Sequence, residues 1–95
     1  MNATEKLAVL KADLQTKTTA NDMYLGKLLQ MAERLITAEG IELEADNIYC
    51  DMAIIHYAAY LFRKRGGTIE ETAMPRYLRY ELNNLLFAQK AVDNA

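Results

Sequence analysis

Few side chains in this 95-residue chain are of the types that carry out chemistry. Its single cysteine, Cys50, and its single histidine, His56, could in principle bind zinc together or act as nucleophile and base. They are six positions apart, which on a helix separates them by roughly 240° about the axis. One metal ion cannot reach both, so we expect Cys50 to be a packed core thiol and His56 a helix-surface or partly buried imidazole.

The carboxylates do not form a catalytic group either. Asp51 lies within an apolar stretch, where an isolated charge is costly to bury, so it either faces solvent or meets an arginine from the last helix. Glu70 and Glu71 are adjacent, and adjacent residues point in different directions on a helix. The sequence therefore predicts no catalytic residue, no cofactor and no metal site, and we expect a protein that is not an enzyme.

The spacing of apolar residues predicts an all-α fold, a small bundle of four helices with short connections. A hinge separates the last two helices. Gly26 lies inside the second helix, where glycine is unfavourable, so we expect a neighbouring helix to approach closely there. The predicted helices cover about 4–14, 20–39, 46–65 and 75–90.

Residues that start and stop helices mark these boundaries. Thr19 and Asp22 have the spacing of a capping box for the second helix, and Gly40 follows its last turn. Asp46 is expected to cap the third helix, which Gly66 and Gly67 would end. Pro75 occupies the first position of the last helix, where its missing amide costs nothing. We find no internal repeat or domain boundary, so residues 1–95 form one domain.

Composition narrows the possible functions. Apolar residues make up 52% of the chain, and the formal net charge is −2 with a pI near 5.3. The electrostatic field of a protein with negative net charge repels nucleic acid and anionic membranes unless a local basic patch overcomes it. The longest apolar run, Ile48 to Phe62, is shorter than the roughly 20 residues that span a bilayer, so no membrane partner is expected. One cysteine permits no internal disulfide, which suits a reducing cytoplasm.

Basic and aromatic residues are concentrated in the last third of the chain. On the predicted last helix Arg76, Arg79 and Tyr80 share one flank, and Tyr77 lies one step round from it. Tyrosine and arginine are enriched at protein interfaces, so this cluster is a candidate subunit or partner interface. Two other interpretations stay open: tyrosines that complete the core beside arginines that extend from it to solvent, or a phosphate-binding site. The full set is Arg63, Lys64, Arg65, Arg76, Tyr77, Arg79 and Tyr80.

Charge is also divided unevenly along the chain. Residues 1–60 carry five basic and nine acidic side chains, whereas residues 61–95 carry six basic and four acidic. Two electrically different ends suit a subunit that joins unlike patches of neighbouring copies, although ordinary solvated helix ends would give the same count.

Three segments carry a family resemblance: residues 52–65, 74–84 and, more loosely, 25–32. They resemble the head-tail connector (adaptor) proteins of tailed bacteriophages, in the short form found in phages and prophages of Gram-positive bacteria. The more specific part is the Met-Pro-Arg-Tyr-Leu-Arg-Tyr run followed by Asn83 and Asn84. Most of the chain, from about Leu7 to Lys90, is covered.

The resemblance implies a structural virion protein with no catalytic activity. Members of that family form a homo-oligomeric ring, commonly a dodecamer, beneath the portal protein. The ring continues the DNA channel and docks a head-completion or tail-completion protein. The implied location is the head-tail junction of the virion, after synthesis in the bacterial host cytoplasm, with DNA passing through the ring only transiently.

The main alternative is a small helical nucleic-acid-binding protein, regulatory or involved in packaging. Its last helix would read DNA with Arg76, Tyr77 and Arg79 in the first turn. The long hinge before that helix and the negative net charge both argue against it.

Overall fold

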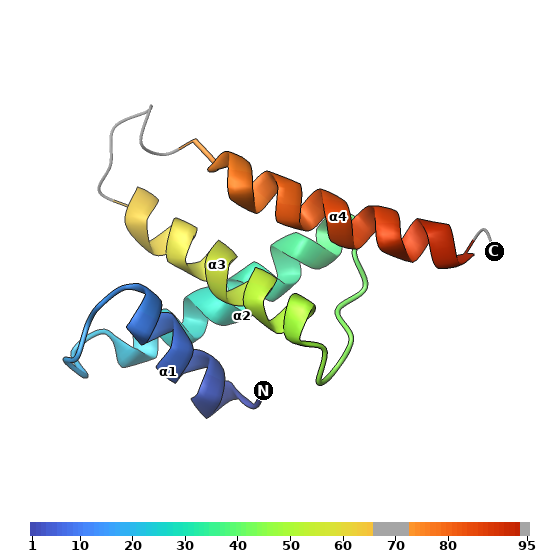
Figure 1. Ribbon diagram of the computed structural model, residues 1–95. Helices are drawn as coiled ribbons and strands as arrows, with labels where there is room; N and C mark the ends of the chain where they lie inside the picture. The colour runs from blue at the N-terminus through green and yellow to red at the C-terminus, as the bar shows by residue number, and fades with distance from the viewer. Residues whose placement is uncertain (66–72, 94–95) are drawn as a thin grey trace.

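The computed structural model describes residues 1–65 and 73–93, the last three by their backbone, and confirms the all-α prediction. Its described part contains four helices and no strand, and Figure 1 shows them packed together. The predicted stop at Gly66 and Gly67 and the hinge turn with Glu70 and Glu71 lie outside the described residues. The helices are α1 (Ala3–Asp13), α2 (Asp22–Ala38), α3 (Ile48–Lys64) and α4 (Arg76–Asp93).

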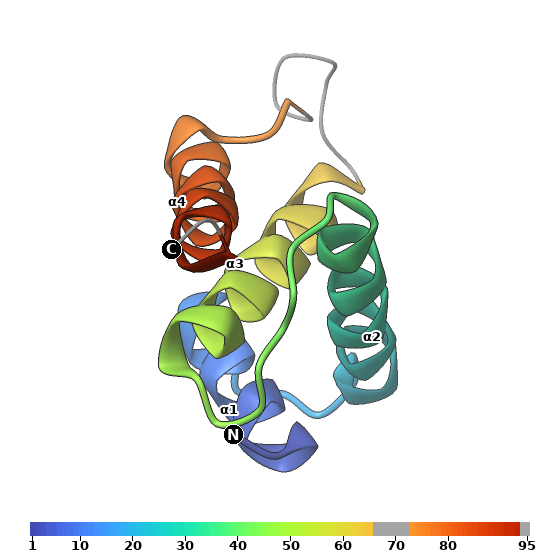
Figure 2. The same ribbon diagram turned by 90° about the vertical axis from the view of Figure 1, so that its right-hand side faces the viewer.

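Helix α3 is the centre of the fold. Nine of its 17 residues are buried, so it is covered on most sides rather than along one stripe. Figure 2 shows α2 and α4 on opposite sides of α3. Three alanines on α3, Ala53, Ala58 and Ala59, are fully buried, and their small side chains leave room for the neighbouring helices.

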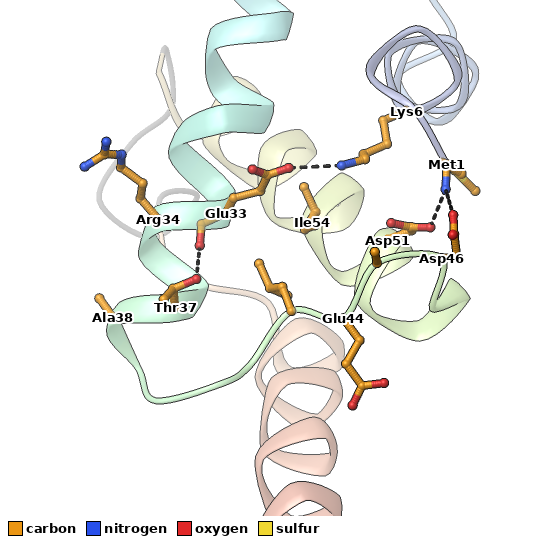
Figure 3. Close-up of a pocket in the computed structure, with 12 residues that line it drawn as sticks. Met1, Lys6, Glu33, Arg34, Thr37, Ala38, Glu44, Asp46, Asp51 and Ile54 are labelled. Atoms are coloured by element: carbon orange, nitrogen blue, oxygen red, sulfur yellow. Dashed lines mark hydrogen bonds and ion pairs between the residues drawn. The ribbon is translucent and has the colours of Figure 1, made fainter.

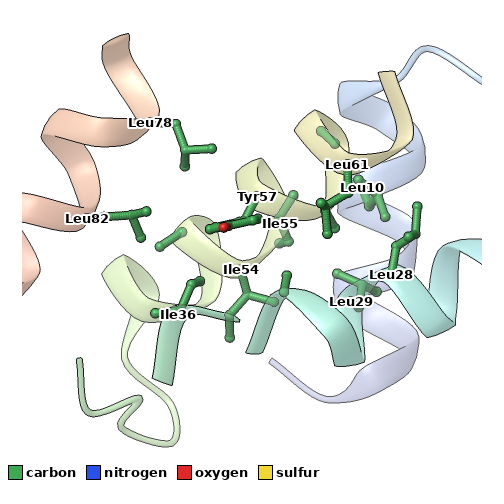
Figure 4. Packing of buried hydrophobic residues seen from close by; sticks show 14 of the residues in the cluster. Leu10, Leu28, Leu29, Ile36, Ile54, Ile55, Tyr57, Leu61, Leu78 and Leu82 are labelled. Atoms are coloured by element: carbon green, nitrogen blue, oxygen red, sulfur yellow. The ribbon is translucent and has the colours of Figure 1, made fainter. Parts of the chain in front are cut away.

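Two leucines fix α4 to this centre. Leu78 and Leu82 are one turn apart and fully buried, and Figure 4 shows both pointing toward Tyr57 of α3. Helix α4 runs in the opposite direction to α3 (Figure 1). The opposite face of α4 therefore stays on the surface. On the other side of α3, Leu25, Leu29 and Ile36 of α2 complete the core.

Two predicted caps are wrong because other side chains provide the contacts. No side chain caps α2, since the Asp22 carboxylate forms an ion pair with Lys11 of α1 (Oδ1 to Nζ, 2.9 Å) instead of a capping box with Thr19. Helix α3 is capped by Asn47, whose Oδ1 accepts the amides of Tyr49 and Cys50 at 2.9 and 3.3 Å. Asp46 has a left-handed backbone (φ 59°) and lies outside the helix.

The ends of α4 also differ slightly from the prediction. The helix begins at Arg76, one residue later than expected, and the carbonyl of Pro75 accepts its first amide bond, from Arg79. Pro75 is therefore the residue that precedes the helix, where its fixed φ and missing amide still do no harm. The helix continues to Asp93, beyond the predicted end at Lys90.

Glycines 26 and 40 differ in what they do. Gly40 ends α2 with φ 93°, the left-handed conformation expected of it. The expected close approach at Gly26 is wrong, because a Cβ built there meets nothing within 4 Å. The space beside it is a hollow between α1 and α2, lined by Ala3, Leu7 and Leu29 among others.

We therefore expect opposite effects from two alanine substitutions. Gly26→Ala should raise the free energy of unfolding by roughly 0.5–1 kcal/mol, because alanine loses less backbone entropy in a helix and meets no steric obstacle. Gly40→Ala should lower it by roughly 1–2 kcal/mol, because its left-handed backbone disfavours a Cβ. Urea unfolding of the two variants, followed by circular dichroism, measures both changes. A destabilised Gly26→Ala variant would contradict the open space at that position.

Candidate assembly surface

The three basic residues at and just after the end of α3, Arg63, Lys64 and Arg65, each contact another part of the protein. Arg63 donates from Nη2 to the backbone oxygen and Oδ2 of Asp13, at 3.3 and 3.4 Å. The Lys64 ammonium lies 5.4 Å from the centre of the Tyr60 ring. The Arg65 guanidinium stacks 4.0 Å from the centre of the Phe62 ring. All three side chains remain exposed, but each also has an intramolecular contact.

Arg79 is an internal clamp between α4 and the end of α2. Its two terminal nitrogens donate to the two carboxylate oxygens of Glu39, each at 2.9 Å. This bidentate geometry fixes the guanidinium plane. The hydrogen bond to Glu39 raises the pKa of Arg79 further above its usual value. Arg79 is thus turned away from Tyr80, its predicted partner on the flank of the helix, and toward α2.

The exposed face of α4 is aromatic. Tyr80 and Phe87, seven residues apart and so on one side of the helix, are 67% and 62% exposed. Tyr77 is half exposed and meets His56 of α3 edge to face, with ring centres 5.9 Å apart. We call Tyr77, Tyr80 and Phe87 the α4 row. Arg76 lies beside it, exposed, and forms no ion pair with any described residue.

Sequence reasoning found Tyr77 and Tyr80 but missed Phe87. The signal was present, because Phe87 follows Tyr80 by two helical turns and the buried leucines occupy the opposite side. It also missed Tyr49, which belongs to the apolar run from Ile48 to Phe62 yet is 74% exposed. Tyr49 stands in register with His56 and Tyr60, the less buried side of α3.

Tyr49 forms one wall of a second surface feature. Two adjoining hollows of about 260 and 320 Å³ lie beside its ring, and both are also lined by Leu85 and Ala88 of α4. Glu42 and Glu44, from the segment between α2 and α3, form the rim of one of them. We call this feature the α3/α4 groove.

Gln89 holds the rim of the groove in place. Its side-chain amide accepts the Glu42 backbone N–H at 2.9 Å and donates to the Glu42 carbonyl at 2.6 Å. This reciprocal pair ties the segment between α2 and α3 to α4. Contacts within the chain itself therefore hold the Glu42 backbone at the rim.

A cleft of about 690 Å³ lies between α2, the start of α1 and the segment that follows α2 (Figure 3). Asp51 borders this cleft, and the prediction made for its side chain is wrong. The side chain is buried and accepts a hydrogen bond of 2.9 Å from the Met1 amino group, rather than facing solvent or meeting an arginine. The bond raises the pKa of that amine. Lys6 and Glu33 form a second ion pair there, at 3.0 Å.

Cys50 and His56 are not brought together. Cys50 is buried, with its thiol 3.9 Å from the Glu42 carbonyl oxygen. His56 Nδ1 lies 2.8 Å from Glu81 Oε2 of α4. Among the side chains of residues 1–65 and 73–90, no three of the histidine, cysteine and acidic residues group closely enough to hold a metal ion. The same part of the chain contains no helix with the length and apolar character to cross a membrane.

No family model, curated protein or solved structure matches this chain.

We expect Arg79→Ala to lower the free energy of unfolding by roughly 1 kcal/mol through loss of the clamp to Glu39. The value is modest because the Arg79 side chain is 42% exposed and solvent screens part of the attraction. Arg76→Ala, one helical turn earlier, is the matched control and should change stability by less than about 0.5 kcal/mol. Adding Glu39→Ala to Arg79→Ala should cost less than the sum of the single changes. Equal effects of Arg76→Ala and Arg79→Ala in urea unfolding would contradict the clamp.

A second prediction concerns alkaline pH. Burial raises the pKa of the Tyr57 phenol, and the nearby Glu39 carboxylate raises it further. The folded protein therefore holds this proton to higher pH than the unfolded chain, whose tyrosine pKa is about 10. The resulting stability is fully present below that pH and is lost as pH rises through the folded-state pKa.

Urea unfolding at several values between about pH 9 and pH 11 measures this loss. The Tyr57→Phe variant should lose less stability over that range than the wild-type protein. Tyr80→Phe, which alters an exposed phenol, should keep the wild-type dependence. An identical slope in Tyr57→Phe and the wild type would rule out the assignment.

Proposed function

We propose that the protein is a ring-forming head-tail connector of a tailed bacteriophage, docked beneath the portal and joined on its other side to a head-completion or tail-completion protein. The observation that carries the proposal is the α4 row. Three aromatic rings exposed along one helix of a small domain are typical of a surface that a partner covers. The likeness of residues 52–65 and 74–84 to connector proteins supplies the kind of partner.

The intramolecular pairing of Arg63 and Arg79 supports the same proposal. A subunit that surrounds passing DNA must not hold phosphates tightly. Arg79 is already paired with Glu39, and Arg63 with Asp13. The net charge of −2 further weakens attraction to DNA.

The nucleic-acid-binding alternative receives less support from this geometry. A reading helix places several donors from its first turn in the major groove. Of the three residues considered, Arg79 faces α2 and Tyr77 packs on His56, which leaves Arg76 alone. Duplex binding that weakens steeply with salt and is lost on Arg76→Ala would favour this alternative over the connector.

The test is reconstitution with the portal protein encoded in the same phage or prophage genome. Mixed with assembled portal, the protein should form a ring on it that electron microscopy resolves. Replacing Tyr80 and Phe87 together by alanine should weaken binding to portal, or to the next protein along the tail, by at least about tenfold. The exchange Tyr80→Phe with Phe87→Tyr keeps both rings and serves as the matched control.

Two outcomes would contradict the proposal. One is the absence of any ring on portal at concentrations at which the protein remains folded. The other is binding of the double alanine variant to portal and to the tail-side protein with wild-type affinity, which would remove the α4 row from the assembly.

A further inference from the structure

The outward face of α2 is an exposed surface that the proposed function has not yet used. Met23 and Met31 are 83% and 53% exposed, and Lys27 and Arg34 are exposed between and beyond them. These four residues recur at steps of four, four and three, so they lie on one side of the helix. The opposite side carries the leucines that enter the core. We call Met23, Lys27, Met31 and Arg34 the α2 face.

The α2 face carries unpaired positive charge. Neither Lys27 nor Arg34 forms an ion pair with any residue in the described part of the chain. The neighbouring acids of α2 are occupied by α1, since Asp22 pairs with Lys11 and Glu33 pairs with Lys6. In Figure 3 Arg34 points away from the ion pairs of the cleft.

The α3/α4 groove carries the opposite charge. Its rim residues Glu42 and Glu44 are exposed, and neither forms an ion pair with a described residue. Among the described residues, the Glu44 carboxylate accepts a side-chain hydrogen bond only from the amide of Asn47, at 3.4 Å. Tyr49, Leu85 and Ala88 line both hollows and form the apolar part of the groove. The other lining residues are Asn47, Cys50, Glu81, Asn84 and Gln89.

We infer that the α2 face of one copy docks into the α3/α4 groove of the next copy of this chain. Lys27 and Arg34 would meet Glu42 and Glu44, and the two methionines would enter the hollows beside Tyr49. Methionine suits this role because its unbranched side chain adapts to irregular apolar space. The charges favour a second copy of the chain as the occupant, because the α2 face carries unpaired positive charge and the α3/α4 groove carries unpaired negative charge.

The placement of the two surfaces gives this contact a consequence for assembly. Figure 2 shows α2 on one side of α3 and α4 on the other. A contact between unlike surfaces on opposite sides repeats from copy to copy, and it closes into a ring when the rotation at each step allows. The inference rests on the proposed function in that it supplies the subunit contact of the ring, and it leaves the α4 row to the other virion proteins.

Charge exchange tests the contact, with sedimentation equilibrium at low ionic strength as the measurement. The wild-type protein should show mass above the monomer that rises with concentration and falls with added salt. Lys27→Glu with Arg34→Glu should weaken self-association by at least about tenfold, as should Glu42→Lys with Glu44→Lys. All four positions are on the surface, and circular dichroism should show unchanged helix content.

Recombining the exchanged charges separates a specific contact from general repulsion. An equal mixture of the two double variants should associate, because each contact in an alternating assembly again joins opposite charges. The quadruple variant, with both surfaces reversed, should also associate with itself. Tyr49→Ala should weaken association without changing net charge.

Three results would overturn the inference. They are a wild-type protein that stays monomeric in sedimentation equilibrium at low ionic strength, double variants that associate as the wild type does, or no recovery of association in the mixture and the quadruple variant. These results are distinct from failure of the proposed function. If the charge-exchange variants form the same ring on portal as the wild type does, the connector function is supported and the inferred contact is ruled out. If self-association depends on these charges but the protein does not bind portal, the inferred contact is supported and the connector function is ruled out.

Discussion

Burial of α3 on most of its surface is the constraint on which the rest of the structure depends. A 95-residue chain has little apolar surface to bury, so one helix in contact with the other three makes the most of it. The small side chains of Ala53, Ala58 and Ala59 allow these close contacts. Because each outer helix gives its apolar side to α3, its other side must face outward. The exposed faces of α2 and α4 follow from this arrangement.

The charged residues then divide between holding the fold and remaining available. Arg79, Lys6 and Lys11 join neighbouring helices or their ends through ion pairs. Such pairs contribute little stability each when partly exposed, but they set how the helices are placed. Lys27 and Arg34 have no such role in the described residues, and neither do the carboxylates of Glu42 and Glu44. These four side chains are therefore available to pair with a partner.

The helices could be predicted because apolar periodicity reports burial directly. The role of Gly40 at the end of α2 was equally predictable, since few other residues adopt its backbone conformation. The caps were less readable, because Asp22 could serve the backbone or Lys11, and only the packing of α1 decides between them. The same limit applies to Arg79. Its place on the helix suggested an outward flank, but the end of α2 brings Glu39 within reach. Pairings between residues distant in sequence depend on tertiary packing.

The position of Glu39 also links fold and assembly. It ends α2 and holds Arg79 of α4, so it joins the two helices whose outer faces are the candidate contact surfaces. Gln89 makes a comparable link farther along α4, where it holds the backbone of Glu42. Both links lie on the side of α4 turned toward the rest of the protein, and neither uses the α4 row. A partner bound at that row would therefore leave the links intact, and the α2 face and the α3/α4 groove would keep their relative positions. The proposed subunit contact and the proposed partner contact would then form independently of each other.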